Sequence, residues 1–190
     1  MNQLILASTS VYRQELLKRL GLPFTAQAPG VDEDAEKNKG FQPRKLAEHL
    51  ACLKAHSLGA PGSVVIGGDQ LVDFQGKILG KPGSVDAAIQ QLQAMSGKSH
   101  NLITAVCVAS DGGETLITDI TRMTLRTLTL SEIERYVHQD LPLDCAGAYK
   151  IEKLGITLMQ KIETEDFTAI QGLPLMKLAN VLRGKGFHLP

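Results

Sequence analysis

Two short apolar runs constrain the fold of this chain more than any other feature of its sequence. Leu4–Ala7 is followed by small residues and a helix-like segment, Val11–Leu20, and Val64–Ile66 is followed by Gly67-Gly68-Asp69-Gln70. Continuous apolar runs of this kind are typical of strands that are covered on both faces of a sheet. A second helical pattern begins at Pro43, so strands and helices alternate in the first part of the chain. This order predicts an α/β fold.

Hairpin signals dominate the middle of the chain instead. Turns are predicted at Gln75-Gly76 and at Asp111-Gly112-Gly113, and a further strand over Gly155–Ile162. The acidic, lysine-rich stretch Val31–Gly40 indicates a loop, and Ser131–Glu134 matches the capping box that opens a helix. We therefore expect residues 1–190 to form a single α/β domain, with a mixed twisted sheet in two lobes.

The charge balance and the cysteines exclude several classes of partner. Twenty basic and twenty acidic residues cancel, so no global field attracts nucleic acid or a membrane surface. Cys52, Cys107 and Cys145 are odd in number and far apart, and neither they nor the five histidines have metal-ligand spacing. No segment has the pattern of a signal peptide or a membrane span. We expect a cytoplasmic protein with reduced cysteines.

Hydroxyl groups and an arginine follow the first predicted strand. Ser8 and Ser10 lie at the strand-to-helix turn, and Arg13 lies just inside the helix. A helix amino terminus presents unpaired N–H groups and partial positive charge, and a guanidinium suits phosphate. The alternative is that Ser10 only caps the helix and that Arg13 is solvated. This stretch alone favours that alternative, because such caps are common.

Four further charged residues match the same chemistry. Asp69 follows a predicted strand and is expected at the carboxyl edge of the sheet, where α/β folds bind ligands. Lys54 lies on a stripe of alanines, Lys81 follows a hairpin, and Glu33 lies in the acidic stretch. Each has an ordinary alternative, namely a turn carboxylate, a snorkelling or surface lysine, or a solvated acid. Together with the hydroxyls and Arg13 they are the groups that a metal–polyphosphate site requires.

In this order the motifs resemble the Maf family of nucleotide pyrophosphatases, whose fold is related to that of inosine-triphosphate pyrophosphatases. Four segments of this chain correspond to motifs of the family. The Ser-x-Ser-Pro-Arg motif corresponds to LASTSVYRQELL, and Val-Asp-Glu corresponds to VDED. Ala-x-x-Lys-Ala corresponds to LACLKAHSL, and Gly-x-Asp-Gln corresponds to IGGDQ. ILGKP, MSGKSH, CAGAYKIEKLGITL and GLPL follow in family order, so the resemblance covers essentially the whole chain. It implies the family's fold, in which two lobes flank a central cleft.

The resemblance also implies an activity, which is hydrolysis of a nucleoside triphosphate to the monophosphate and diphosphate with Mg²⁺ or Mn²⁺. By this carry-over Asp69 accepts a proton from the attacking water. The residues that it implies for triphosphate binding are Ser8, Ser10, Arg13, Lys54 and Lys81, and those for the metal are Glu33 and Asp69.

Three positions at which the family sorts its substrates correspond to Tyr12, Gln70 and Glu152. The aromatic residue and the Lys-x-Glu pattern resemble the subgroup that hydrolyses 7-methyl-GTP, whereas the dTTP/UTP subgroup has an arginine near position 12 and Gly-x-Gln near 152. An aromatic ring can stack on a cationic methylated purine. A carboxylate can accept hydrogen bonds from guanine. Another nucleotide preference within the family is the alternative.

Val11, Gln14 and Gly68 depart from the family pattern, where proline, a second arginine, and alanine or serine are usual. None of these departures removes a proposed catalytic group, although Val11 and Gly68 are expected to loosen the geometry of their loops. An alternative from another class is a nucleotide-binding regulator of septum formation, which would not need two carboxylates beside a polyanion. The resemblance also allows for a homodimer, and it implies neither a nucleic-acid nor a membrane partner.

Overall fold

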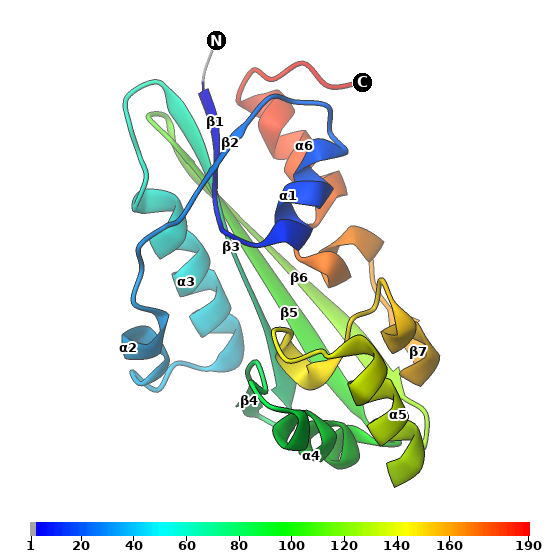
Figure 1. Cartoon of the computed structure of the whole chain (residues 1–190). Coiled ribbons are helices and arrows are strands. Elements are labelled where there is room, and N and C mark those ends of the chain that lie inside the picture. Colours follow the sequence, from blue (N-terminus) through cyan, green and yellow to red (C-terminus); the bar gives the residue numbers. More distant parts are fainter. Residues whose placement is uncertain (1–2) are drawn as a thin grey trace. The chain divides into compact units, whose positions relative to one another are not determined.

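The computed structural model describes residues 3–190, and seven strands of these residues form one sheet (Figure 1). The sheet order is β2-β1-β3-β5-β6-β7, with β4 paired to β3. β1 runs parallel to β2 and β3, whereas β3/β4 and β6/β7 are antiparallel, so the sheet is mixed. The predicted mixed α/β fold is confirmed. The strands are β1 (Gln3–Ala7), β2 (Thr25–Gln27), β3 (Ser63–Phe74), β4 (Lys77–Leu79), β5 (Ser99–Ser110), β6 (Gly113–Leu125) and β7 (Met159–Glu163).

Six α-helices and three short 3₁₀ helices complete the described residues. The α-helices are α1 (Val11–Lys18), α2 (Glu33–Lys37), α3 (Pro43–His56), α4 (Val85–Met95), α5 (Leu130–Asp140) and α6 (Leu175–Gly184). The 3₁₀ helices are η1 (Ala146–Ala148), η2 (Leu154–Leu158) and η3 (Phe167–Gln171). The predicted turn at Gln75-Gly76 joins β3 to β4, with positive φ at both residues, as a tight hairpin requires.

The helix α2 corrects the expectation of a plain loop over 31–40. Asp32 caps it by accepting a hydrogen bond from the Ala35 N–H at 3.1 Å. Acidic residues fill its first turn and Lys37 its last, which is the charge order that the helix dipole favours. The same acidic residues that suggested a solvated loop therefore stabilise one turn and a half of helix.

The chain folds into two compact units, and β3, β5 and β6 each contribute to both. The first unit holds the described residues up to Gln70 together with Thr104–Asp119 and Asp166–Pro190. The second holds Leu71–Ile103 and Ile120–Glu165. The expectation that residues 1–190 form a single domain stays a prediction.

In the first unit, helices cover both faces of the sheet (Figure 1). On one face, apolar side chains of α1 and α6 pack on alternate residues of the strands. This cluster contains Leu4, Leu6, Leu16, Leu17, Val64, Ile66, Val106, Val108, Ile117, Leu173, Leu175, Leu178 and Leu182. On the other face, Ile5, Ala7 and Val65 pack with Leu58, which follows α3. The continuous apolar runs of β1 and β3 are thus explained, because both of their faces are buried.

β3 also corrects the sequence analysis, which ended this strand at its glycines. The strand continues from Ser63 through Gly67 and Gly68 to Phe74, so Asp69 lies within it. Gly67 is required for packing, since a Cβ atom there would lie 2.2 Å from the Ala51 carbonyl oxygen on α3. Glycine therefore marks a close approach of helix to strand at this point and not the end of the strand.

In the second unit, α4 packs against α5. Two elements of this unit, α5 and β7, begin at residues other than those predicted. The capping box begins at Thr129, two residues earlier than predicted, because Glu132 reaches back to the Thr129 N–H at 2.8 Å. The strand expected over Gly155–Ile162 begins only at Met159, since Leu154–Leu158 forms η2. Ser84 caps α4, because its Oγ accepts a hydrogen bond from the Ala87 N–H at 3.3 Å.

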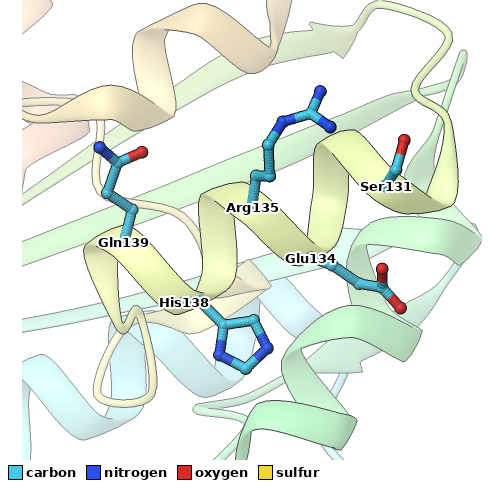
Figure 2. Close-up of a pocket in the computed structure, with 5 residues that line it drawn as sticks. All are labelled: Ser131, Glu134, Arg135, His138 and Gln139. Atoms are coloured by element: carbon cyan, nitrogen blue, oxygen red, sulfur yellow. The ribbon is translucent and has the colours of Figure 1, made fainter.

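The outer face of α5 is exposed and lines a pocket, and Figure 2 shows the side chains that it presents. Its side chains recur at helical spacing, and they are Ser131, Glu134, Arg135, His138 and Gln139. None of these residues belongs to the set predicted for nucleotide binding. None of the helices among residues 3–190 is long and apolar enough to cross a membrane.

His100 of β5 makes the stability of the second unit dependent on pH. It is buried with Nε2 2.9 Å from the Tyr149 hydroxyl oxygen, and burial lowers its pKa from 6.5 to about 4. Between these values the unfolded chain binds a proton that the folded chain excludes, so acidification through this window favours unfolding. At about 1.4 kcal/mol per pKa unit, we expect the free energy of unfolding to fall by about 3 kcal/mol.

The measurement is urea unfolding followed by circular dichroism at neutral pH and near the lower end of that window. His100→Gln should lose less stability on acidification than the wild-type chain. His138→Gln, on the exposed face of α5, is the matched control and should follow the wild type. Equal pH dependence in wild type and His100→Gln would contradict the prediction.

Candidate active site

Lys54 lies at the centre of the candidate site in the first unit. Its Nζ lies 2.8 Å from Asp69 Oδ1 and 2.7 Å from Glu33 Oε1. Lys54 and Asp69 are 4% and 7% exposed, while the Glu33 side chain is 40% exposed. The buried charge of a lysine on an alanine stripe is explained, because two carboxylates pair with it. The sequence predicted these three residues, and α3, β3 and α2 bring them together.

Asp69 is the carboxylate best placed for proton transfer. Burial raises its pKa, the positive charges of Lys54 and Arg13 act in the opposite direction, and the charge of Glu33 raises it further. A carboxylate with a raised pKa is a stronger base than an exposed one. The site therefore combines a basic carboxylate with neighbouring cations that can meet phosphate charge.

Arg13 reaches this cluster from the first turn of α1. Its Nε donates a hydrogen bond to the Gly172 carbonyl oxygen at 3.2 Å. A Cβ atom at Gly68 would lie 3.4 Å from that Nε, and one at Gly172 would lie 3.3 Å from Arg13 Cγ, so the side chain passes close to both glycines. Burial lowers the pKa of Arg13, and the charges of Asp69 and Glu33 oppose that shift.

The two serines of the β1–α1 turn organise the backbone at this point. Ser8 Oγ accepts a hydrogen bond from the Ser10 N–H at 3.1 Å, and Ser10 Oγ accepts one from the Arg13 N–H at 3.4 Å. Ser10 is thus the N-cap of α1, as the simpler interpretation of the sequence had it. Each hydroxyl can still donate its proton to an anion while its oxygen accepts.

Gln70 follows Asp69 on β3 and holds the loop around η3. Its Nε2 donates to Thr104 Oγ1 at 2.8 Å and to the Ala169 and Ile170 carbonyl oxygens at 3.0 and 3.2 Å. Thr104 Oγ1 in turn donates to the Ala169 carbonyl oxygen at 3.0 Å. The amide nitrogen of Gln70 is therefore occupied within the first unit, which leaves its carbonyl oxygen for a ligand.

Of the remaining predicted residues, Tyr12 is half-buried in the first turn of α1, whereas Lys81 and Glu152 belong to the second unit. Both are exposed, Lys81 between β4 and α4 and Glu152 in the turn between η1 and η2. Their part in the site stays a prediction. The nearby Lys150 has a local structural role, because its Nζ lies 3.0 Å from Asp144 Oδ1 and donates to the Leu141 carbonyl oxygen at 3.2 Å.

Comparison with known proteins agrees with the motifs. The family model described as "Maf-like protein" matches residues 3–185. The chain belongs to the Maf family. A protein of Bdellovibrio bacteriovorus named 7-methyl-GTP pyrophosphatase is 59% identical over 180 residues, which are 95% of each chain. Proteins of the same name from Xanthomonas oryzae pv. oryzae and Syntrophotalea carbinolica are 48% and 44% identical, covering 100% and 96% of this chain and 100% and 94% of their own.

The structure explains one departure of this Maf chain from its family pattern. Gly68, where alanine or serine is usual, lies within β3 and not in a loop, so the expected loosening of a loop does not apply. It lies beside the Arg13 side chain, as does Gly172. Gly172 belongs to the GLPL motif, but its contact with Arg13 through the carbonyl oxygen was not predicted, because contact between such distant positions has no local signal.

A residue that the sequence analysis missed is Lys37 of α2. Its Nζ lies 3.0 Å from Asp34 Oδ1 and 4.0 Å from Glu33 Oε2. Lys37 therefore adds a cation beside Glu33, the exposed acid of the candidate site. The signal was present as the acid–lysine spacing of VDEDAEK, which a helix brings onto one face.

The donor set at this site fits a hard divalent cation. Glu33 and Asp69 supply carboxylate oxygens that converge on one cationic atom, Lys54 Nζ. Mg²⁺ is commonly held by one or two protein carboxylates, with substrate phosphates and water completing its coordination. Two converging carboxylates beside cations for phosphate are therefore a sufficient protein contribution.

Proposed function

We propose that this chain hydrolyses 7-methyl-GTP to 7-methyl-GMP and diphosphate, which keeps the modified nucleotide away from polymerases. The observation that carries the proposal is the 59% identity, over 95% of each chain, to a protein named 7-methyl-GTP pyrophosphatase. The paired carboxylates and cations of the first unit supply the chemistry that this reaction needs. The names of the relatives favour neither a dTTP/UTP preference nor a regulator of septum formation.

In the proposed reaction Asp69 accepts a proton from water. The water oxygen forms a bond to the α-phosphorus, the bond from that phosphorus to the bridging oxygen breaks, and diphosphate leaves. Burial of Asp69 strengthens it as a base, and Lys54 at 2.8 Å orients its carboxylate. General-base assistance of this kind contributes about 100- to 10,000-fold to rate.

The triphosphate is held by cations and hydroxyls. Arg13 and Lys54 meet its negative charge from the first unit, and the hydroxyls of Ser8 and Ser10 donate at the amino terminus of α1. The family resemblance assigns a further positive charge for the triphosphate to Lys81. Lys54 exchanges part of its pairing with carboxylate for pairing with phosphate when the substrate binds.

Glu33 and Asp69 would hold the Mg²⁺ or Mn²⁺ ion. When bound, the ion would neutralise the charge that develops on the leaving diphosphate. Lys54 would then act on the phosphate and no longer on both carboxylates. This change of partners is the reason that the site carries two acids for one buried lysine.

The base is selected by Tyr12, Gln70 and Glu152. The Tyr12 ring stacks on the cationic 7-methylguanine, since a positively charged ring is attracted to an aromatic face. Glu152 accepts hydrogen bonds from the guanine N–H groups, and Gln70 offers its carbonyl oxygen. The expected homodimer and the cytoplasmic location stay predictions.

The test is diphosphate release from a panel of standard and modified nucleoside triphosphates, with and without Mg²⁺ or Mn²⁺. We expect a metal-dependent signal that is greatest for 7-methyl-GTP. A different favoured nucleotide would keep the reaction and overturn the assignments of Tyr12 and Glu152. Binding without hydrolysis across the panel, by correctly folded protein, would overturn the enzymatic proposal and favour a regulator.

A further inference from the structure

A second cluster of ligand-type side chains lies in the first unit, separate from the carboxylates of Glu33 and Asp69. It consists of Cys52 from α3, Cys107 from β5 and Glu114 from β6, whose ligand atoms all lie within 4.8 Å of one another. Cys107 Sγ lies 3.8 Å from Glu114 Oε2, and His56 Nε2 lies 2.6 Å from the same oxygen. No step of the proposed hydrolysis uses these four residues.

The helix α3 separates this cluster from the nucleotide site. Cys52 and His56 are four residues apart and share one face of the helix, whereas Lys54 lies between them and points to Asp69. Another residue of the same face, Glu48, accepts a hydrogen bond from Thr118 Oγ1 of β6 at 2.9 Å. This face of α3 therefore lies along β6, where Glu114 is placed.

The two cysteines of the cluster lie at different depths below the surface. The thiolate is the form of cysteine that binds metals. Cys107 is buried, Cys52 is half-buried and Glu114 is exposed, so the cluster has a closed base and a side that is open to solvent.

The donor set selects a cation of intermediate softness. Two sulfurs and one carboxylate match Zn²⁺, which binds cysteine at about 2.3 Å and carboxylate at about 2.0–2.2 Å in tetrahedral sites. Tetrahedral coordination at those lengths places ligand atoms about 3.3–3.8 Å apart. Because all the ligand atoms lie within 4.8 Å of one another, binding the ion requires only small movements of the side chains.

His56 has a different role from the three ligands. At 2.6 Å its Nε2 and Glu114 Oε2 are hydrogen-bonded and too close to be two ligands of one tetrahedral ion. A histidine that holds a ligating carboxylate in this way orients it toward the metal.

We propose that Cys52, Cys107 and Glu114 bind a Zn²⁺ ion, and that His56 orients Glu114 for this purpose. The ion links α3 to β5 and β6 and so stabilises the first unit. The spacing of these residues along the chain gave no sign of a metal site, because the three ligands come from three separate elements.

The test uses the full chain, reduced and freed of metal by chelation, and titrated with Co²⁺ without oxygen. Cobalt bound by thiolates absorbs through sulfur-to-metal charge transfer, which a carboxylate site such as Glu33–Asp69 cannot produce. We expect one equivalent of Co²⁺ to develop this absorption and Zn²⁺ to abolish it. Zinc affinity is then measured by competition with a coloured chelator, and the thermal midpoint should rise when Zn²⁺ binds.

The variants are Cys52→Ser, Glu114→Gln and His56→Gln, none of which changes a fully buried residue. Cys52→Ser should remove the absorption, and His56→Gln should weaken Zn²⁺ binding by about 10- to 100-fold, as loss of an orienting partner does. Glu114→Gln should weaken it at least as much. Cys145→Ser, whose thiol lies in the second unit, is the matched control and should bind like the wild type.

Three outcomes would overturn the proposal. The first is absence of the charge-transfer absorption in folded wild-type chain. The second is an unchanged absorption in Cys52→Ser. The third is a disulfide that forms on mild oxidation, detected as loss of two thiols, in a chain that has no affinity for Zn²⁺ when reduced; that result would assign the pair to redox chemistry.

Discussion

Replacement of Asp69 by asparagine is expected to lower kcat for diphosphate release by about 100- to 10,000-fold, while nucleotide binding stays close to that of the wild type. The reason is that an amide cannot accept the proton of the attacking water. Asparagine has nearly the same shape, and its oxygen can still accept the hydrogen bond from Lys54 Nζ, which also keeps Glu33 at 2.7 Å. Steady-state kinetics and direct binding of a non-hydrolysable analogue measure the two effects separately.

The control for this variant is Asp34→Asn. Asp34 is also an acid of the first unit and lies beside Glu33 in sequence, but its side chain is 88% exposed and paired with Lys37. It should keep wild-type kcat and KM. Full activity of Asp69→Asn would remove Asp69 from the role of general base. Loss of activity in both variants would point to a general effect of charge at this site.

The sequence alone predicted which residue types make up the candidate active site, and the structure supplied the contacts between them. Hydroxyls at a strand-to-helix turn and a lysine among alanines are local signals, because backbone geometry and burial leave traces in neighbouring residues. The contact of Lys54 with both Asp69 and Glu33 joins three elements, and no local pattern encodes it. The unexplained lysine was nevertheless a reliable sign that acids would be found opposite it.

The errors of the sequence analysis have physical causes of their own. The α2 helix was missed because helix-capping acids and solvated acids have the same composition. The capping box was placed two residues late because both Thr129 and Ser131 have a glutamate three residues further on, and only one can reach back to its N–H. The cluster of Cys52, Cys107 and Glu114 was missed because spacing rules detect ligands that share an element.

The pair Gly67-Gly68 was interpreted as the end of a strand, but Gly67 lies against α3 in the middle of β3. Its replacement is therefore expected to destabilise the fold strongly. Gly67→Ala is expected to lower the free energy of unfolding by about 3 kcal/mol or more, at the upper end of what overpacking usually costs. A Cβ atom there would lie 2.2 Å from the Ala51 carbonyl oxygen and 2.4 Å from the Ala55 backbone nitrogen. Both are backbone atoms of α3, so relief requires the helix to move away from β3.

The neighbouring Gly68→Ala is the matched control, since it adds the same methyl group to the same strand. Its Cβ would lie 3.4 Å from Arg13 Nε and 3.6 Å from the Ala105 carbonyl oxygen, which are ordinary contacts. Alanine also restricts the unfolded chain more than glycine, which by itself stabilises a protein by about 0.4–1 kcal/mol. We therefore expect Gly68→Ala to be as stable as the wild type or slightly more stable.

Urea unfolding followed by circular dichroism suits this comparison, because the chain has no tryptophan for a fluorescence signal. A displaced α3 would also move Lys54 away from Asp69, so Gly67→Ala should lose activity even where it remains folded. Equal stability of the two variants would mean that α3 is not held tightly against β3. A loosely packed α3 would not hold Lys54 at a fixed distance from Asp69. That result would therefore also contradict the geometry proposed for the active site.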